Sequence, residues 1–244
     1  MKLWRSWVVA QNDLDVFAHK KYSLYSLVAL PAVLSVGLPV MLWLLIQRNN
    51  ASALEVEVLL NAFAFIFIVL PSLLPTILAS YSFVGEKLDR SLEPLLSTPA
   101  TDGELLLGKG LAAFLPSLLA TYLGAGVFVV LADQLTGARV GFAYFPNAEL
   151  EAILMVAAPL ACIFSVEVNV MISSLVSDLR AAQQLGVLVL VPIGGLYVLA
   201  ETNFLSLSGV SLLVVSAFLA ALDLLLFFLG RGTFRREKIL TEWK

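Results

Sequence analysis

The chain has 244 residues, of which 60% are hydrophobic and 14% are charged, with a net charge of −3 and a mean hydropathy of +0.94. This composition excludes a water-soluble globular domain and indicates a chain whose solvent is mostly lipid. The single cysteine, Cys162, excludes an intramolecular disulfide and a CxxC redox pair.

The first 23 residues are predicted to form an amphipathic helix ahead of the first membrane span. Its apolar residues recur at helical spacing, and most of its charged residues lie elsewhere. The apolar set is Leu3, Trp4, Trp7, Val8, Leu14 and Phe17. We expect this helix to lie in the inner membrane interface with its tryptophans at headgroup depth. The alternative is a simple membrane anchor with no mechanical role.

Residues 24–244 are predicted to form one all-α integral membrane domain, a bundle of six transmembrane helices. A span needs about 20 predominantly apolar residues to cross roughly 30 Å of hydrocarbon. Six runs meet this condition, at residues 24–46, 58–84, 106–131, 150–176, 184–201 and 209–229. Prolines fall within most of these runs, so neighbouring helices are expected to satisfy the carbonyls that they free.

The distribution of Lys and Arg between the spans predicts the orientation. Alternate segments, beginning with the N-terminal one, hold 13 of the 15 basic residues and the others hold 2. Because basic residues are retained on the cytoplasmic side, both termini are predicted to be cytoplasmic. That arrangement requires an even number of spans, and we expect a multi-pass protein of the cell membrane.

The segment between the second and third spans, residues 85–109, is predicted to form a cytoplasmic loop. Its pattern favours a short helix along the membrane, a turn, and a new helix capped by Thr101 or Asp102 through Glu104. A solvated connector would have a similar pattern. The stretch 103–110 fits part of a phosphate-binding loop, but Gly110 stands where that loop needs Ser or Thr. We therefore expect no nucleotide site there, and expect Lys109 to extend towards water at the end of the third span.

Two acidic residues lie within predicted spans, where an ionisable group is costly and usually faces a cavity or a partner. Glu167 lies near the middle of the fourth span with Asn169 close by, and Asp223 lies in the sixth. All three are candidates for lining a polar pathway. The alternative is that Glu167 is protonated or hydrogen-bonded between helices and serves packing.

Sequence motifs for catalysis are absent. The chain has one histidine, His19, and so lacks an HExxH motif, and it has no G-x-S-x-G motif. We therefore predict a transport protein and not an enzyme, with no cofactor or metal of its own and no nucleic-acid partner. Two alternatives stay open: a secondary transporter driven by an ion gradient through Glu167, and an intramembrane hydrolase using Glu167 or Asp223.

Several segments resemble the permease subunits of type-2 ATP-binding-cassette (ABC) transporters. They are Glu86-Lys87, residues 91–99 (SLEPLLSTP), residues 104–109 (ELLLGK), residues 173–184 (SSLVSDLRAAQQ) and residues 234–240 (FRREKIL). The chain departs from the family pattern at Ser91, where threonine is commoner, and at Pro94. Together with six spans and inside termini, the resemblance covers nearly the whole chain.

The resemblance implies half of an exporter's translocation pathway, driven by a separate cytoplasmic ATP-binding subunit that holds ATP and Mg²⁺. A second permease, identical or related, would complete the pathway as a homo- or heterodimer within the membrane lipids. The loop at 85–109 and the entry helix would dock on the ATPase. The residues expected in that coupling are Glu86, Lys87, Arg90, Glu93 and Leu96, with Leu95 packing the loop.

Overall fold

The computed structural model describes residues 2–19, 21–49, 52–89, 100–140, 144–201 and 209–233, and within these ranges the chain is helical and contains no strand. The elements are α1 (Leu3–His19), α2 (Lys21–Asn49), α3 (Ala53–Ala64), α4 (Ile66–Leu88), α6 (Asp102–Val140), α7 (Ala148–Ala152), the π-helical turn η1 (Ile153–Ala157), α8 (Ala158–Leu175), α9 (Leu179–Gly186), the 3₁₀ turn η2 (Val187–Val189), α10 (Leu190–Glu201) and α11 (Gly209–Thr233).

Several of these helices are long and apolar enough to cross a membrane, which indicates a multi-pass membrane protein. Within the described residues there are five, at Leu24–Arg48, Ala53–Leu88, Asp102–Gly137, Ala148–Leu175 and Leu213–Gly230. They coincide with the predicted first, second, third, fourth and sixth spans. The predicted fifth span, at 184–201, falls on α9, η2 and α10, where the apolar helix Leu179–Gly195 is shorter. The count of six therefore stays a prediction.

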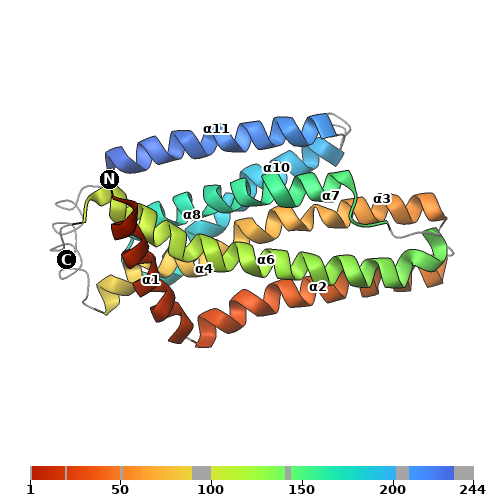
Figure 1. Ribbon diagram of the computed structural model, residues 1–244, viewed down its shortest axis with the longest axis horizontal. Helices are drawn as coiled ribbons and strands as arrows, with labels where there is room; N and C mark the ends of the chain where they lie inside the picture. Colours follow the sequence, from red (N-terminus) through yellow and green to blue (C-terminus); the bar gives the residue numbers. More distant parts are fainter. Residues whose placement is uncertain are drawn as a thin grey trace.

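The long helices lie side by side along one axis, and α1 crosses them at one end (Figure 1). α4 packs most extensively against α8. In the most apolar stretch of each span, 67% of the residues of α3–α4 are buried, against 28% in α2 and 28% in α11. Exposed apolar residues of such a bundle face lipid. The high buried share of α3–α4 therefore places α4 at the centre of the bundle, and the low shares of α2 and α11 place them at its periphery.

Two of the spans are interrupted, and both contain proline. α3 and α4 are separated at Phe65, where the Ile68 N–H bonds to the Phe65 carbonyl at 2.9 Å. The π-helical turn η1 precedes α8, and the Ala158 N–H bonds there to the Ile153 carbonyl. Pro159, the next residue, has no N–H to continue the helical pattern, so a wider turn is accommodated at this point.

α1 occupies the predicted amphipathic segment and has two different faces. The face against the bundle carries Ser6, Ala10, Asp13 and Phe17. The exposed residues of α1 include the apolar Leu3 and Trp4, at 76% and 73% of their accessible surface, and the polar Gln11, Asn12 and Asp15. Exposed leucine and tryptophan side chains are expected of an amphipathic helix in contact with lipid. Phe17 was predicted to belong to the apolar set that faces the membrane interface. It is buried against the bundle instead, because it lies on the same face of the helix as Ser6, Ala10 and Asp13.

Candidate functional site

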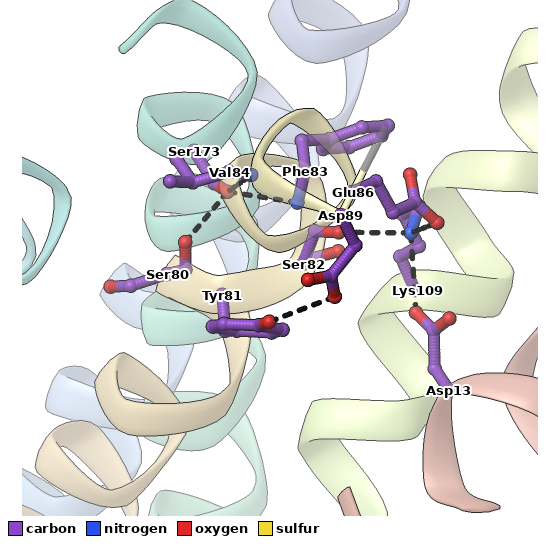
Figure 2. A network of polar contacts seen from close by, with 10 residues as sticks. All are labelled: Asp13, Ser80, Tyr81, Ser82, Phe83, Val84, Glu86, Asp89, Lys109 and Ser173. Atoms are coloured by element: carbon purple, nitrogen blue, oxygen red, sulfur yellow. Dashed lines mark hydrogen bonds and ion pairs between the residues drawn. The ribbon is translucent and has the colours of Figure 1, made fainter. Parts of the chain in front are cut away.

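A buried ionic cluster joins α1, α4 and α6 at one end of the bundle, and Figure 2 shows its residues. The side chain of Lys109, on α6, has no exposed surface. Its Nζ donates to Glu86 Oε1 of α4 at 2.7 Å, to Asp13 Oδ2 of α1 at 3.3 Å and to the Ser82 carbonyl at 3.1 Å. It also lies 4.8 Å from the centroid of the Phe83 ring, a cation–π contact.

The expectation that Lys109 extends towards water is therefore wrong. Because α1 packs across the first turns of α6, it covers Lys109 and supplies Asp13 as a counter-ion. The cluster holds two carboxyl groups and one ammonium, and Glu86 Oε2 has no hydrogen-bond partner among the described residues. Burial raises the pKa of Asp13 above its ordinary value, and the charge of Lys109 offsets that effect only in part.

The start of α6 is fixed to α1 by a second set of contacts. Thr101 caps the helix: its Oγ1 accepts from the Glu104 N–H at 3.3 Å, and its own N–H donates to Glu104 Oε2 at 3.0 Å. The Lys2 N–H also donates to Glu104 Oε1, at 2.6 Å, and an Arg5 guanidinium nitrogen lies 3.9 Å from Glu104 Oε2. The predicted cap is confirmed, and its acidic residue, Glu104, also binds the N-terminal segment that begins α1.

Gly108 allows α1 and α6 to approach each other closely between these two sets of contacts. A Cβ at this position would lie 2.7 Å from the Ser6 carbonyl oxygen and 2.7 Å from Val9 Cβ. The whole stretch 103–110 is helical. Its internal amides are therefore engaged along the helix and do not converge around a phosphate, as they would in a phosphate-binding loop.

The predicted docking residues divide into two groups. Glu86 and Lys87 lie inside the end of the bundle: Glu86 binds Lys109, and Lys87 Nζ donates to the Ser174 and Val176 carbonyls at 2.9 and 2.8 Å. A cation at the carboxyl end of α8 also interacts favourably with the helix dipole. Both residues thus hold α4 in place. The other predicted docking residues, Arg90, Glu93, Leu95 and Leu96, lie outside the described residues.

Polar side chains connect α4 and α8 along their whole contact. Ser165 Oγ donates to the Ser72 carbonyl at 2.5 Å, and Ser173 Oγ donates to the Ser80 carbonyl at 2.8 Å. Asn169 lies between them, fully buried, and its Nδ2 donates to Thr76 Oγ1 at 3.2 Å. The pairs advance together along both helices, so α4 and α8 are parallel. Asn169 was a candidate for lining a pathway, but these contacts favour a packing role.

Glu167 and Asp223 have different surroundings from Asn169. Glu167 lines a cavity between α6, α8 and α11. Asp223, on α11, is 7% exposed, and neither of its carboxyl oxygens has a hydrogen-bond partner among the described residues. The two acids are near enough to interact electrostatically. Of the three pathway candidates, the structure brings these two together.

Sequence analysis missed Asp13 as part of the cluster. A signal was nevertheless present, since Ser6, Ala10, Asp13 and Phe17 recur every three or four residues and so form one helix face. Small and polar residues at that spacing are typical of close helix packing in membranes.

In comparisons with known proteins, no family model matches the chain and no curated protein matches its sequence.

Proposed function

We propose that this chain is the permease subunit of a type-2 ABC exporter, forms half of a translocation pathway, and is driven by a separate ATPase. The observation that carries the proposal is the ionic cluster at the two ends of the segment 85–109. Glu86 lies before residues 90–99 and Lys109 lies after them; the two side chains bind each other, and Lys109 also binds Asp13 of α1. A force applied to the segment would therefore act on α1, α4 and α6 together, a rigid-body mode of gating.

The proposal includes six spans with both termini in the cytoplasm. The 13-to-2 distribution of basic residues supports this orientation. The helical backbone also continues from Leu179 to Glu201 through η2. At about 1.5 Å per residue, that length is close to the roughly 30 Å of a hydrocarbon core. α9, η2 and α10 would then supply the fifth crossing, and a second permease would complete the pathway.

The docking residues in this proposal are Arg90, Glu93, Leu95 and Leu96, and the ATP and Mg²⁺ belong to the partner subunit. Glu86 and Lys87 have a different part, since their side chains already bind within the bundle. We infer that they transmit movement of the loop to α4 and α8. Charged residues of the loop would set the choice of partner more than the affinity.

Purification of the tagged full-length chain from its native membrane, in mild detergent, tests the proposal. We expect an ATP-hydrolysing polypeptide to accompany the wild-type chain and to be lost from the double variant Arg90→Glu/Glu93→Lys. The matched control is Glu151→Lys, an exposed charge reversal on α7 at the opposite end of the bundle (Figure 1). Active transport by a chain that carries no ATPase would contradict the proposal.

A second candidate function is favoured by the position of Glu167. A carboxyl group in a cavity within a membrane span is the usual feature of an ion-coupled secondary transporter. Transport into vesicles distinguishes the two functions. Uptake that continues without ATP, and stops when the proton and sodium gradients are dissipated, would favour the secondary transporter.

A further inference from the structure

A cavity of about 280 Å³ lies between α6, α8 and α11, towards the end of the bundle where α6 begins and α11 ends. Its walls are almost entirely apolar: they include Leu111 and Phe114 of α6, Val170 of α8, and Leu226 and Phe227 of α11. A volume near the lower limit of ligand pockets, roughly 300 Å³, suits a compact hydrophobic molecule. The ionic cluster, between α1, α4 and α6, is a separate feature.

Among the described residues that line the cavity, Glu167 alone is charged. Its Oε2 atom is buried and has no hydrogen-bond partner among the described residues. Asp223, on α11, is nine-tenths buried, and neither of its carboxyl oxygens has a hydrogen-bond partner among the described residues. It is near enough to Glu167 for the two acids to interact electrostatically. A buried carboxyl group in apolar surroundings is costly to ionise unless a positive charge accompanies it, so a cation favours the charged form. No described side chain forms a salt bridge with either acid.

The surroundings favour an organic cation over a metal ion. The described part of the chain contains no group of three or more His, Cys, Asp or Glu side chains that could hold a metal. A small inorganic cation needs several oxygen ligands, which apolar walls do not supply. A cation that carries its own hydrophobic groups needs only a counter-charge and apolar contact. Phe114 and Phe227 add aromatic surface, to which organic cations are attracted.

We propose that this cavity binds a lipophilic organic cation, with Glu167 as its counter-ion and the walls of α6, α8 and α11 enclosing its hydrophobic groups. The position between helices gives such a ligand access from the lipid. The proposal does not depend on the ATPase coupling described above, because binding to the isolated full-length chain is sufficient to test it. If both proposals hold, lipophilic cations are the class of exported substrate.

Equilibrium binding of tetraphenylphosphonium to the purified chain in detergent tests the site. We expect saturable binding by the wild type, weakened about tenfold or more by Glu167→Gln, because the charge pair is lost. Triphenylphosphine oxide, which is similar in shape but uncharged, should bind wild type and Glu167→Gln equally. Glu151→Gln, a change at an exposed acid of α7, should leave binding of the cation unchanged.

A second variant tests the cavity without changing charge. Gly230 lines the cavity, and a Cβ there would meet Met171 Sδ at 3.6 Å, an ordinary contact. Gly230→Leu should therefore fold and fill part of the space, reducing affinity for the cation. Its matched control is Gly126→Leu on α6, where an added Cβ meets nothing within 4 Å. Binding unchanged by both Glu167→Gln and Gly230→Leu, or equal affinity for the cation and its neutral analogue, would overturn the proposal.

Discussion

Lys109 lies where three helices meet, and its charge is balanced by side chains from two of them. Asp13 comes from α1 and Glu86 from α4, while Lys109 itself belongs to α6. Removal of one member of a buried charge set leaves the others without compensation, which costs more than the intact set contributes. The stability of the whole junction therefore depends on this one ammonium group.

Lys109→Met is expected to lower the free energy of unfolding by about 3–5 kcal/mol, because it leaves two buried carboxyl groups unpaired. The measurement is thermal unfolding of the purified protein in detergent. The matched control is Arg48→Met, which removes an exposed cation from α2. Adding Glu86→Gln and Asp13→Asn to Lys109→Met should recover part of the loss. Equal effects of Lys109→Met and Arg48→Met would contradict the importance of the cluster.

Asp13 makes the stability of the junction depend on pH. Burial raises its pKa in the folded protein above the ordinary value of 3.8, although Lys109 opposes the shift. The native state then binds this proton more tightly than the unfolded state does. The stabilisation is complete below the unfolded pKa and is lost as the pH rises through the folded one. Lys109 and Glu86 are the charged groups that face it.

Wild type should therefore lose stability relative to Asp13→Asn as the pH rises from 3.8, the ordinary pKa of this carboxyl group, towards neutral, since asparagine does not titrate. Unfolding of both proteins is followed across that range, so that only the difference between them is interpreted. A difference that moves in favour of wild type with rising pH would show that Lys109 outweighs burial at Asp13, and a constant difference would show that the two effects cancel.

α1 is held to α6 by contacts before, at and after Gly108, which makes this pair of helices a single unit. Gly108→Val would place new atoms against the Ser6 carbonyl and Val9, and backbone cannot yield as a flexible side chain can. We expect α1 to separate from α6. The consequence is measurable at Ser6, which is 1% exposed in the intact contact.

Maleimide labelling of Ser6→Cys, in a Cys162→Ser background, should be slow with Gly108 present and at least about tenfold faster with Gly108→Val, because labelling requires the helix to separate. Gly126→Val provides the control, since an added Cβ there meets nothing within 4 Å. Rapid labelling of Ser6→Cys in the presence of Gly108 would show that the α1–α6 contact is not stable.

The helices were largely predictable from sequence, and their contacts were not. Long apolar runs reveal spans, and Thr101 with Glu104 reveals a cap, because both signals are local. The burial of Lys109 depends on α1 folding back over α6, which places residues 13 and 109 in contact, and no local pattern encodes that. Glu167 and Asn169 are two residues apart, yet one lines a cavity and the other packs against α4, because residues two apart lie on nearly opposite sides of a helix.

At the scale of the whole molecule, the distribution of basic residues predicts where the ends of the chain lie. With six spans, Glu151 faces the outside and Lys238 the cytoplasm; with five, both face the outside. In a Cys162→Ser background, Glu151→Cys should therefore react with an impermeant maleimide in intact cells, and Lys238→Cys only after permeabilisation. Labelling of Lys238→Cys in intact cells would show that α9, η2 and α10 do not cross the membrane.

The central claim is that an ATPase binds the segment between α4 and α6, and cross-linking from Leu96 tests it most directly. A photoreactive phenylalanine analogue at Leu96 should capture one polypeptide in native membranes, and photoreactive ATP should label that polypeptide. The same analogue at Glu151, on α7 at the other end of the bundle, should not capture it. Absence of an ATP-binding product from Leu96, or the same product from Glu151, would contradict the account.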